Sequence, residues 1–483
     1  MLTPAQTAPA QLDRRYVWHP FTQMRDWLRR APIVIVDGRG AVLRDAAGRR
    51  YLDANSSIWT NLHGHAHPKI NAALGRQLQK IAHSSALGLA SEPASRLAQK
   101  LIQSAARSRA PSVPPRPAPP RLARVFFSDD GATAMEVALK LAFQFARRAG
   151  RSRRPEFLCL DSAYHGDTVG AASLGHIDLF HRSYAGLLFK TGRVMSPYCY
   201  RCPFNRAKPE RADAREYRQC HWECISQVEQ KFGARKKKGD PYAAFVFEPL
   251  VQGAAGMIPQ PAGWLGRAAE IARGHGALLI ADEVMTAFGR ATVSAPSLLA
   301  CHQENVHPDF AALAKGLTGG YLPMAATLAT REVFAAFLGR YDEFKTFFHG
   351  HSFTGNQLGA AAALASLEIL ESRASLAARQ SLAKTMREEL QTLWPLRRVG
   401  DIRQVGLVAG VELVKNWKTR EPFPLREQAG IRVCAAMARR GVLTRPVGNV
   451  IVLMPPYCAT RVQAQKMVRV LRESILETFG MSP

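Results

Sequence analysis

The chain has 483 residues, of which 47% are hydrophobic, which excludes wholesale disorder and allows two to three domains or one large α/β unit with a smaller partner. Its formal net charge of +27 comes from basic residues spread along the chain without interleaved aromatic residues, so we interpret it as a solvated surface and expect no nucleic-acid partner. No apolar run approaches the roughly 20 residues that span a membrane, and the first residues lack the apolar stretch of a secretory signal, so we expect no membrane contact and a cytoplasmic location.

Short β-type runs alternate with amphipathic helices between about residues 120 and 330. The predicted strands are 124–128, 157–160, 243–248, 277–282 and 310–314. Residues 131–150 follow the first strand and repeat apolar residues at helical spacing, which predicts a helix packed on the sheet. This alternation is typical of an α/β fold with a mostly parallel sheet covered on both faces.

Two other regions differ from this pattern. Residues 104–124 are dense in Pro and Arg, which favours an exposed, extended loop. Helices are expected at about 356–393, and the apolar runs 404–414 and 450–455 follow, with helices between and after them. This second region predicts a smaller α+β domain.

Four of the eight cysteines form two pairs within the insertion 195–240: Cys199 with Cys202, and Cys220 with Cys224. Paired thiolates at this spacing are able to hold a tetrahedral zinc ion. The second pair has the less usual C-x3-C spacing, so reduced structural thiols are the favoured interpretation, and a structural zinc ion is the alternative.

Lys315 closes the apolar run 310–314 and opens onto glycines. Lysine is rarely buried unless it is paired or reactive, so this position predicts either a surface residue or a reactive amine. Asp282 ends the predicted strand 277–282, and residues at the carboxyl ends of parallel strands face the ligand crevice. A carboxylate there suits the protonated ring nitrogen of pyridoxal phosphate, and a salt-bridged or helix-capping aspartate is the alternative.

Three further segments fit a flat, phosphorylated cofactor. The backbone amides of Gly131, Ala132 and Thr133 open a predicted helix, where unpaired donors and the helix dipole favour a phosphate. Tyr164 follows a strand and has a ring able to stack on a flat cofactor, although a partly buried structural tyrosine has the same appearance. Ser352 precedes a helix, as a second phosphate donor or as an ordinary helix cap.

Taken together, these residues resemble a known family. The stretches "WHPFTQM", "FFSDDGATAMEVALK", "YHGDTVGAASLG", "LLIADEV", "AKGLTGGYLPMAATLA" and "FFHGHSFTGNQLG" occur in an order similar to class III, fold type I, pyridoxal phosphate-dependent aminotransferases. Within that family the wording resembles the biotin-pathway branch that aminates 8-amino-7-oxononanoate to 7,8-diaminononanoate. The resemblance covers nearly the whole chain. It implies a large domain at 76–350, with a sheet of the seven-stranded type, and a small domain at 351–483 that the segment 1–75 joins.

The resemblance also implies roles for individual residues. Lys315 would bind the cofactor aldehyde and act as general base, Asp282 would hold the ring nitrogen, and Tyr164 would stack on the ring. Gly131 and Ala132 would bind the phosphate, with Ser352 reaching it from the other subunit of a homodimer. The implied substrate-binding residues are Phe21, Ile58, Trp59, Gly350 and Arg445, the last of which would pair with the oxononanoate carboxylate. The implied reaction is a ping-pong exchange between small molecules.

Some positions depart from the family pattern. Ile58 replaces the first of two tryptophans, and Phe21 stands where a tyrosine is usual, so the amino donor stays open between S-adenosylmethionine and lysine. Ala287 and Ala291 occupy glycine positions, which is tolerated only where φ is negative. The alternatives are another class III transaminase acting on an ω-amino acid, a pyridoxal phosphate aminomutase and, from charge alone, a nucleic-acid-binding protein.

Overall fold

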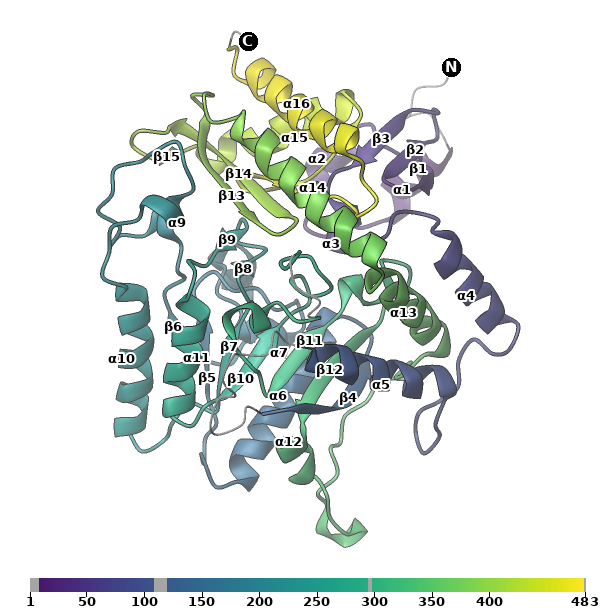
Figure 1. Cartoon of the computed structure of the whole chain (residues 1–483), viewed down its shortest axis with the longest axis vertical. Helices are drawn as coiled ribbons and strands as arrows, with labels where there is room; N and C mark the ends of the chain where they lie inside the picture. The colour runs from purple at the N-terminus through teal and green to yellow at the C-terminus, as the bar shows by residue number, and fades with distance from the viewer. Residues whose placement is uncertain (1–7, 108–119, 294–297, 482–483) are drawn as a thin grey trace.

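The computed structural model describes residues 8–107, 120–293 and 298–481 (Figure 1). Its centre is a seven-stranded sheet in the order β4-β12-β11-β10-β7-β5-β6. The strands are β4 (Leu122–Ser128), β5 (Phe157–Leu160), β6 (Gly192–Val194), β7 (Ala244–Phe247), β10 (Leu278–Asp282), β11 (Phe310–Leu313) and β12 (Ala325–Thr330). β12 runs antiparallel to both of its neighbours, and the other adjacent pairs are parallel. The predicted α/β fold with a mostly parallel sheet is therefore confirmed.

Both faces of this sheet are buried, which is why its strands read as continuous apolar runs. Successive residues of β10 alternate between two cores because side chains in a strand point to opposite faces. Leu278 and Ile280 join the core that contains α6 (Gly131–Arg148), and Leu279 and Ala281 join the one that contains α11 (Trp264–Gly274). The helices on each face thus hold the carboxyl ends of the strands in fixed positions.

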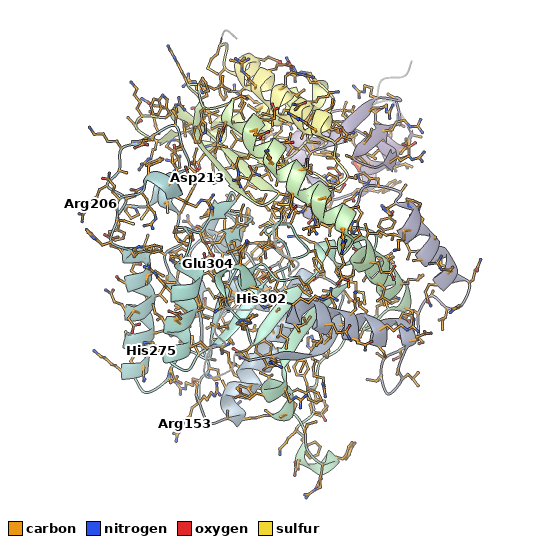
Figure 2. The ribbon with its side chains drawn as sticks, viewed as in Figure 1. Arg153, Arg206, Asp213, His275, His302 and Glu304 are labelled. Carbon is orange, nitrogen blue, oxygen red and sulfur yellow. The ribbon has the colours of Figure 1, made fainter. Side chains whose placement is uncertain are left out.

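The two ends of α11 are tied to neighbouring segments. The Glu304 carboxylate accepts hydrogen bonds from the amides of Gly263 and Gly266, at 2.8 and 3.0 Å, where the helix begins. His275, at its other end, stacks on Phe232 of α10 (Glu223–Lys237) with ring centroids 5.6 Å apart. Glu304 and His275 are labelled in Figure 2. These contacts fix α11 and α10 beside the sheet.

Smaller sheets lie above the main sheet in Figure 1. Their strands are β1 (Ile35–Arg39), β2 (Val42–Asp45), β3 (Arg50–Asp53), β8 (Val251–Gln252), β9 (Ile258–Pro259), β13 (Val399–Val405), β14 (Val408–Asn416), β15 (Glu421–Pro422), β16 (Val442–Leu443), β17 (Pro446–Val447) and β18 (Val450–Leu453). β3 pairs in parallel with β16, so segments from the two ends of the chain share one sheet. β8 and β9 form a separate two-stranded hairpin.

The remaining helices surround these sheets. They are α1 (Ala8–Tyr16), α2 (Met24–Leu28), α3 (Ser56–Trp59), α4 (Pro68–Leu78), α5 (Glu92–Ala106), α7 (Val169–Leu174), α8 (Asp178–His181), α9 (Ala214–Tyr217), α12 (Arg331–Ala335), α13 (Gln357–Leu370), α14 (Arg373–Gln391), α15 (Ala429–Arg439) and α16 (Arg461–Thr478). α14, α15 and α16 cover β13, β14 and β18 at the top of Figure 1. Below α12, the segment leading to α13 projects from the body of the molecule.

The segments 104–124 and 404–414 each contribute to more than one element. Most of the Pro-rich loop at 104–124 lies outside the described residues; its first residues end α5, and its last residues begin β4. The run 404–414 is not one strand, because Gly406 (φ +57°) and Leu407 turn the chain between β13 and β14. In the part of the chain that the structure describes, no helix is both long and apolar enough to cross a membrane.

Candidate active site

A cavity of about 680 Å³ lies at the carboxyl ends of the parallel strands. β4, β5, β7, β10 and β11 share one direction, so the residues that follow them meet at one edge of the sheet. The cavity is lined by Asp129, Gly131, Ala132, Tyr164, His165, Asp167, Glu248, Asp282 and Lys315, and by Trp59, Ala254 and Met285 from other elements. The structure therefore brings together six predicted site residues: Trp59, Gly131, Ala132, Tyr164, Asp282 and Lys315.

Lys315 follows β11 and begins a short 3₁₀ turn, with a φ of +41° that is unusual for a residue with a side chain. Its Nζ lies 4.7 Å from the centre of the Trp59 ring. Burial lowers the pKa of the amine, against the opposing charges of Asp282 and Glu248. A lowered pKa increases the share of neutral amine, which is the form that acts as nucleophile and base.

Asp282 is held by a buried histidine that the sequence analysis missed. His165 Nδ1 lies 2.7 Å from Asp282 Oδ2, and the amide of Val284 donates to Oδ1 at 3.1 Å. Burial acts to lower the pKa of His165, but the hydrogen bond to Asp282 and the charges of Asp282 and Glu248 outweigh it, so the pKa is raised. The Asp282 carboxylate is therefore fixed at the cavity wall by an imidazole whose pKa is raised.

Glu248 follows β7 directly and is also buried. Its carboxylate accepts from the amide of Tyr164 at 3.3 Å and from the amide of Gly253 at 2.7 Å. Burial raises its pKa to about 7, with the charge of His165 opposing this and that of Asp282 adding to it. Glu248 thus links the loops after β5 and β7 beside Asp282.

The start of α6 presents backbone donors to the cavity. Asp130 caps the helix, since its carboxylate accepts from the amide of Thr133 at 2.8 Å while the Thr133 hydroxyl accepts from the amide of Asp130 at 2.9 Å. Gly131 and Ala132 line the cavity. A Cβ on Gly131 would lie 2.8 Å from Cγ1 of Val284, so only glycine allows this close approach of backbone to the β10 loop.

The predicted aromatic and arginine residues gather at the mouth of the cavity. Tyr164 donates to Asp167 Oδ2 at 2.7 Å, and burial raises its pKa. The rings of Tyr164 and Phe21 meet edge to face, 6.4 Å apart. Arg445 is exposed and donates to the backbone oxygen of Phe21 at 2.9 Å. Three residues far apart in the sequence thus form one surface beside the cavity.

Trp59 reaches the cavity from a left-handed turn. Ser56, Ser57, Ile58 and Trp59 have φ values of +46°, +47°, +63° and +70°, although such conformations usually occur as single residues. Buried Asp53 supports the turn: its Oδ1 accepts from the Ser57 amide at 3.1 Å, and its Oδ2 accepts from the Ser57 hydroxyl at 3.0 Å. Trp59 Nε1 donates to Asn55 Oδ1 at 2.9 Å, which fixes the indole beside Lys315.

Three predicted site residues lie away from the cavity of this single chain. Ile58 is 46% exposed, and Gly350 and Ser352 are exposed on the segment that precedes α13. The Ser352 carbonyl accepts a hydrogen bond from His83 at 2.9 Å. Their proposed roles in substrate and phosphate binding stay predictions.

The cysteine cluster does not support the structural zinc ion that the sequence analysis kept as an alternative. Cys199, Cys202, Cys220 and Cys224 line one small cavity, where burial raises the pKa of Cys199 to about 12 and that of Cys224 to about 11. Among the described residues, no group of three or more His, Cys, Asp or Glu side chains is placed to hold a metal ion. Burial favours neutral thiols here, and all four cysteines are free.

The two alanines at glycine positions are accommodated. Neither Ala287 nor Ala291 is among the described residues with positive φ, and both are buried. The left-handed positions of this loop fall instead on Phe288 (φ +58°) and Gly289 (φ +82°). A methyl group at 287 or 291 therefore adds no backbone strain of the left-handed kind.

Comparison with known proteins gives the class that this fold and site define. The family model described as Aminotransferase class-III matches residues 24–475. The chain belongs to the class III aminotransferases and is an enzyme of that family. It is 46% identical to adenosylmethionine-8-amino-7-oxononanoate aminotransferase from Geobacter sulfurreducens, over 97% of each chain.

Solved structures agree with this assignment. The crystal structure of adenosylmethionine-8-amino-7-oxononanoate aminotransferase from Methanocaldococcus jannaschii is 37% identical and matches with a TM-score of 0.85, over 97% of this chain and 98% of that chain. The omega transaminase from Pseudomonas jessenii in complex with PMP is 25% identical, with a TM-score of 0.86 over 98% of this chain and 99% of that chain. The resemblance inferred from the sequence motifs is confirmed.

Sequence reasoning missed His165, Glu248 and Asp167. His165 and Asp167 follow the predicted strand 157–160, and Glu248 ends the predicted strand 243–248, so the rule that placed Asp282 in the crevice applies equally to them. Asp167 and His165 also lie within the same short stretch as Tyr164. The available signal was position relative to a strand end, rather than a motif.

Proposed function

We propose that this enzyme transfers an amino group to 8-amino-7-oxononanoate and forms 7,8-diaminononanoate in biotin biosynthesis, using pyridoxal phosphate. The supporting observation is the cavity in which the partly buried Lys315 faces Trp59 beside Asp282, in a chain whose relatives at 46% and 45% identity carry that acceptor in their names. The omega transaminases among the structural neighbours support a different acceptor, but at the lower identities of 25% to 28%.

The residues present fit pyridoxal phosphate. Lys315 forms no ion pair within the described part of the chain, so its amine is available to bind an aldehyde. Asp282 faces the cavity as a partner for the ring nitrogen, and Gly131 and Ala132 face it as amide donors for the phosphate. Tyr164 supplies a ring for stacking.

When bound, pyridoxal phosphate supplies an aldehyde that accepts an amino group and a ring that withdraws electrons from the adjacent carbon. Lys315 would hold the aldehyde through its amine and, once free, would move the proton on the carbon that carries the amino group. Its lowered pKa leaves the amine ready to accept that proton. Asp282, held by His165, would keep the ring nitrogen protonated, and Trp59 would shield the Lys315 amine from water.

The mouth of the cavity supplies the substrate contacts. Arg445 is exposed there and able to grip the oxononanoate carboxylate with two parallel hydrogen bonds. Phe21 and Trp59 provide apolar walls for the chain of the substrate, and Ile58 lies on the outer side of the same turn. We assign Gly350 to the wall that a second subunit provides.

We propose a homodimer whose active sites are shared, in the cytoplasm, as expected for a biosynthetic enzyme. The segment below α12 projects from the body of one chain and exposes Tyr341 (95%), Phe344, Phe348 and Phe353, an apolar surface that a second copy would cover (Figure 1). Gly350 and Ser352 lie on this segment, so it is suited to complete the neighbouring site.

Complementation tests this arrangement. The variants Lys315→Ala and Ser352→Asp should each lose activity, because one lacks the amine and the other places a carboxylate at the phosphate. Mixed and refolded together, they should regain activity, since one of the two sites in a mixed dimer then has both native residues. A mixture as inactive as its components would refute sharing of the site.

The amino donor is tested by the half-reaction. S-adenosylmethionine, which the relatives' names specify, is the proposed donor, and lysine is the alternative. Mixing the yellow enzyme with each amine separately, without acceptor, should bleach the visible absorbance only with the true donor. Product formation from 8-amino-7-oxononanoate then tests the acceptor. β-Alanine and 4-aminobutyrate, tried as amino donors in place of S-adenosylmethionine and lysine, test the alternative of an ω-amino acid transaminase. If neither donor bleaches the enzyme, the proposed function fails.

A further inference from the structure

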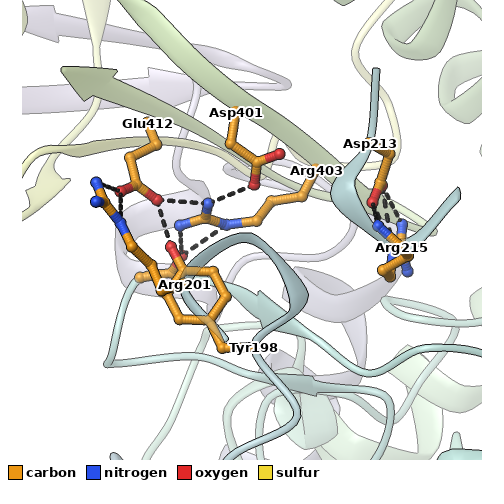
Figure 3. A network of polar contacts seen from close by, with 8 residues as sticks. Tyr198, Arg201, Asp213, Arg215, Asp401, Arg403 and Glu412 are labelled. Carbon is orange, nitrogen blue, oxygen red and sulfur yellow. Dashed lines mark hydrogen bonds and ion pairs between the residues drawn. The ribbon is translucent and has the colours of Figure 1, made fainter. Parts of the chain in front are cut away.

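A buried ionic cluster joins the insertion 195–240 to the sheet of β13 and β14 (Figure 3). Arg403 of β13 is 1% exposed, and its Nη1 donates to Asp401 Oδ2 and to Glu412 Oε2, each at 2.7 Å. Arg201 donates to Glu412 Oε1 from Nε at 3.0 Å and from Nη2 at 2.6 Å, and the Tyr198 hydroxyl donates to Glu412 Oε2. Two guanidinium groups thus face two carboxylates in a buried site.

The rest of the Arg403 guanidinium points to a different segment. Its Nε and Nη2 both donate to the backbone oxygen of Gly256, at 3.1 and 2.6 Å. Gly256 lies in the loop between β8 and β9 and has a φ of +107°, a region that only glycine enters easily. A buried arginine therefore holds, by two donors, the backbone of this loop at its glycine.

That loop forms part of the active site. Ala254 lines the cavity, and the amide of Gly253 donates to Glu248 Oε2 at 2.7 Å. A Cβ on Gly253 would lie 2.6 Å from Sδ of Met285 and 3.3 Å from the Trp59 ring, so the loop packs directly against two cavity walls. The amides of Gly256 and Met257 both bond to the carbonyl of Gly253 at 3.0 Å, which makes residues 253–257 one compact turn.

We propose that Arg403 is a positioning residue for the active site: by holding Gly256, it keeps the 253–257 turn against Trp59 and Met285 and keeps the Gly253 amide on Glu248. The contact lies outside the cavity, so Arg403 touches neither cofactor nor substrate. The groups that face the Glu248 carboxylate are His165, Asp282 and Lys315, and a displaced turn changes the charge environment of all three. This inference rests on the proposed transaminase function.

The test compares two variants within the same buried cluster. Arg403→Lys keeps the positive charge beside Asp401 and Glu412 but removes the fork that holds Gly256. Tyr198→Phe removes one hydrogen bond to Glu412 and leaves the Gly256 contact intact. Both should lower the temperature of unfolding. Only Arg403→Lys should lower kcat/KM, by about tenfold or more, because the two charge-assisted hydrogen bonds to Gly256 are replaced by at most one.

A spectroscopic readout separates positioning from simple stability. In Arg403→Lys, the pH midpoint of the visible absorbance of bound pyridoxal phosphate should shift, and the affinity of the enzyme for pyridoxal phosphate should fall. Tyr198→Phe should match the wild type in the pH midpoint and in the affinity. If Arg403→Lys also matches the wild type, Arg403 is only structural and the inference is wrong. A wild type without visible absorbance would instead refute the proposed function, so the two failures are distinguishable.

A second variant decides the matter if Arg403→Lys does not fold. Gly256→Ala puts a side chain at a φ of +107°, a strained conformation for alanine, and places its Cβ only 3.1 Å from Cγ2 of Val450, so the turn must shift at the position that Arg403 holds. It should reproduce the shift in the pH midpoint. A folded Gly256→Ala variant with an unchanged midpoint would overturn the inference.

Discussion

The left-handed turn at Ser56–Trp59 gives a sharp test of the structure. Each non-glycine residue in this conformation costs about 1–2 kcal/mol. Ser57 is exposed, and its hydroxyl bonds to Asp53, so Ser57→Ala and Ser57→Gly both lose that bond and differ mainly in the strain of the backbone. Glycine relieves about 1–2 kcal/mol of backbone strain in the folded state, but the greater conformational freedom of its unfolded chain costs about 0.5–1 kcal/mol. The free energy of unfolding of Ser57→Gly should therefore exceed that of Ser57→Ala by about 1 kcal/mol.

The assay is urea unfolding of the cofactor-free protein, so that ligand binding does not enter the comparison. Ser381 provides the matched control, because it is exposed in the interior of α14, where alanine should be more stable than glycine by about 1 kcal/mol. The order of the two variants is therefore expected to reverse between the positions. If alanine is the more stable variant at 57 as well, while the pair at 381 behaves as stated, the turn is not left-handed in solution.

Three other substitutions test the cavity. Lys315→Met should abolish transamination. Because the pKa of Lys315 is lowered in the folded protein, the stability of the wild type should rise with pH from that lowered pKa up to the ordinary lysine value. Urea unfolding at several pH values should show that this rise is missing from the variant. Glu248→Gln should remove a slope of the opposite sign. Because the pKa of Glu248 is raised to about 7, the stability of the wild type should fall by on the order of 3 kcal/mol, relative to this variant, as the pH rises from the ordinary pKa of glutamate to 7. Parallel curves of stability against pH would contradict this. Asp282→Asn should bind pyridoxal phosphate yet lower kcat by about 100-fold or more, measured with saturating substrates, because the ring nitrogen loses its anionic partner; near-normal turnover would contradict the role of Asp282.

The central sheet was predictable because its strands are buried on both faces and are therefore apolar throughout, as in 244–247 and 278–282. β12, "AATLAT", was missed because alanine has weak strand propensity, and its place between β4 and β11 depends on packing against α6. The N-terminal sheet was missed for a different reason: β1, "IVDGR", is short and largely exposed, so it has no apolar signal. β16, which comes from the other end of the chain and joins this sheet beside β3, is only two residues long.

At the site, the sequence indicated the residues that carry chemistry but not those that hold them. His165 and Asp282 are 117 positions apart, and their 2.7 Å contact exists only because β5 and β10 end at the same edge of the sheet. The conformation of Ser57 and Ile58 was not predictable either, because left-handed residues are usually glycine or asparagine. Their strain is imposed by Asp53, which lies in another element.

The charges of the cavity explain how a lysine is retained inside the protein. Five carboxylates line it, those of Asp129, Asp130, Asp167, Glu248 and Asp282, against the one lysine, Lys315. The attraction of Asp282 and Glu248 opposes the loss of hydration that burial imposes on the amine, yet the pKa of Lys315 is still lowered. Burial therefore favours the neutral amine, while the charges of Asp282 and Glu248 favour the protonated one. A base that must accept a proton and then return it needs both effects. An exposed lysine with its ordinary pKa keeps its proton near neutral pH and therefore cannot accept another.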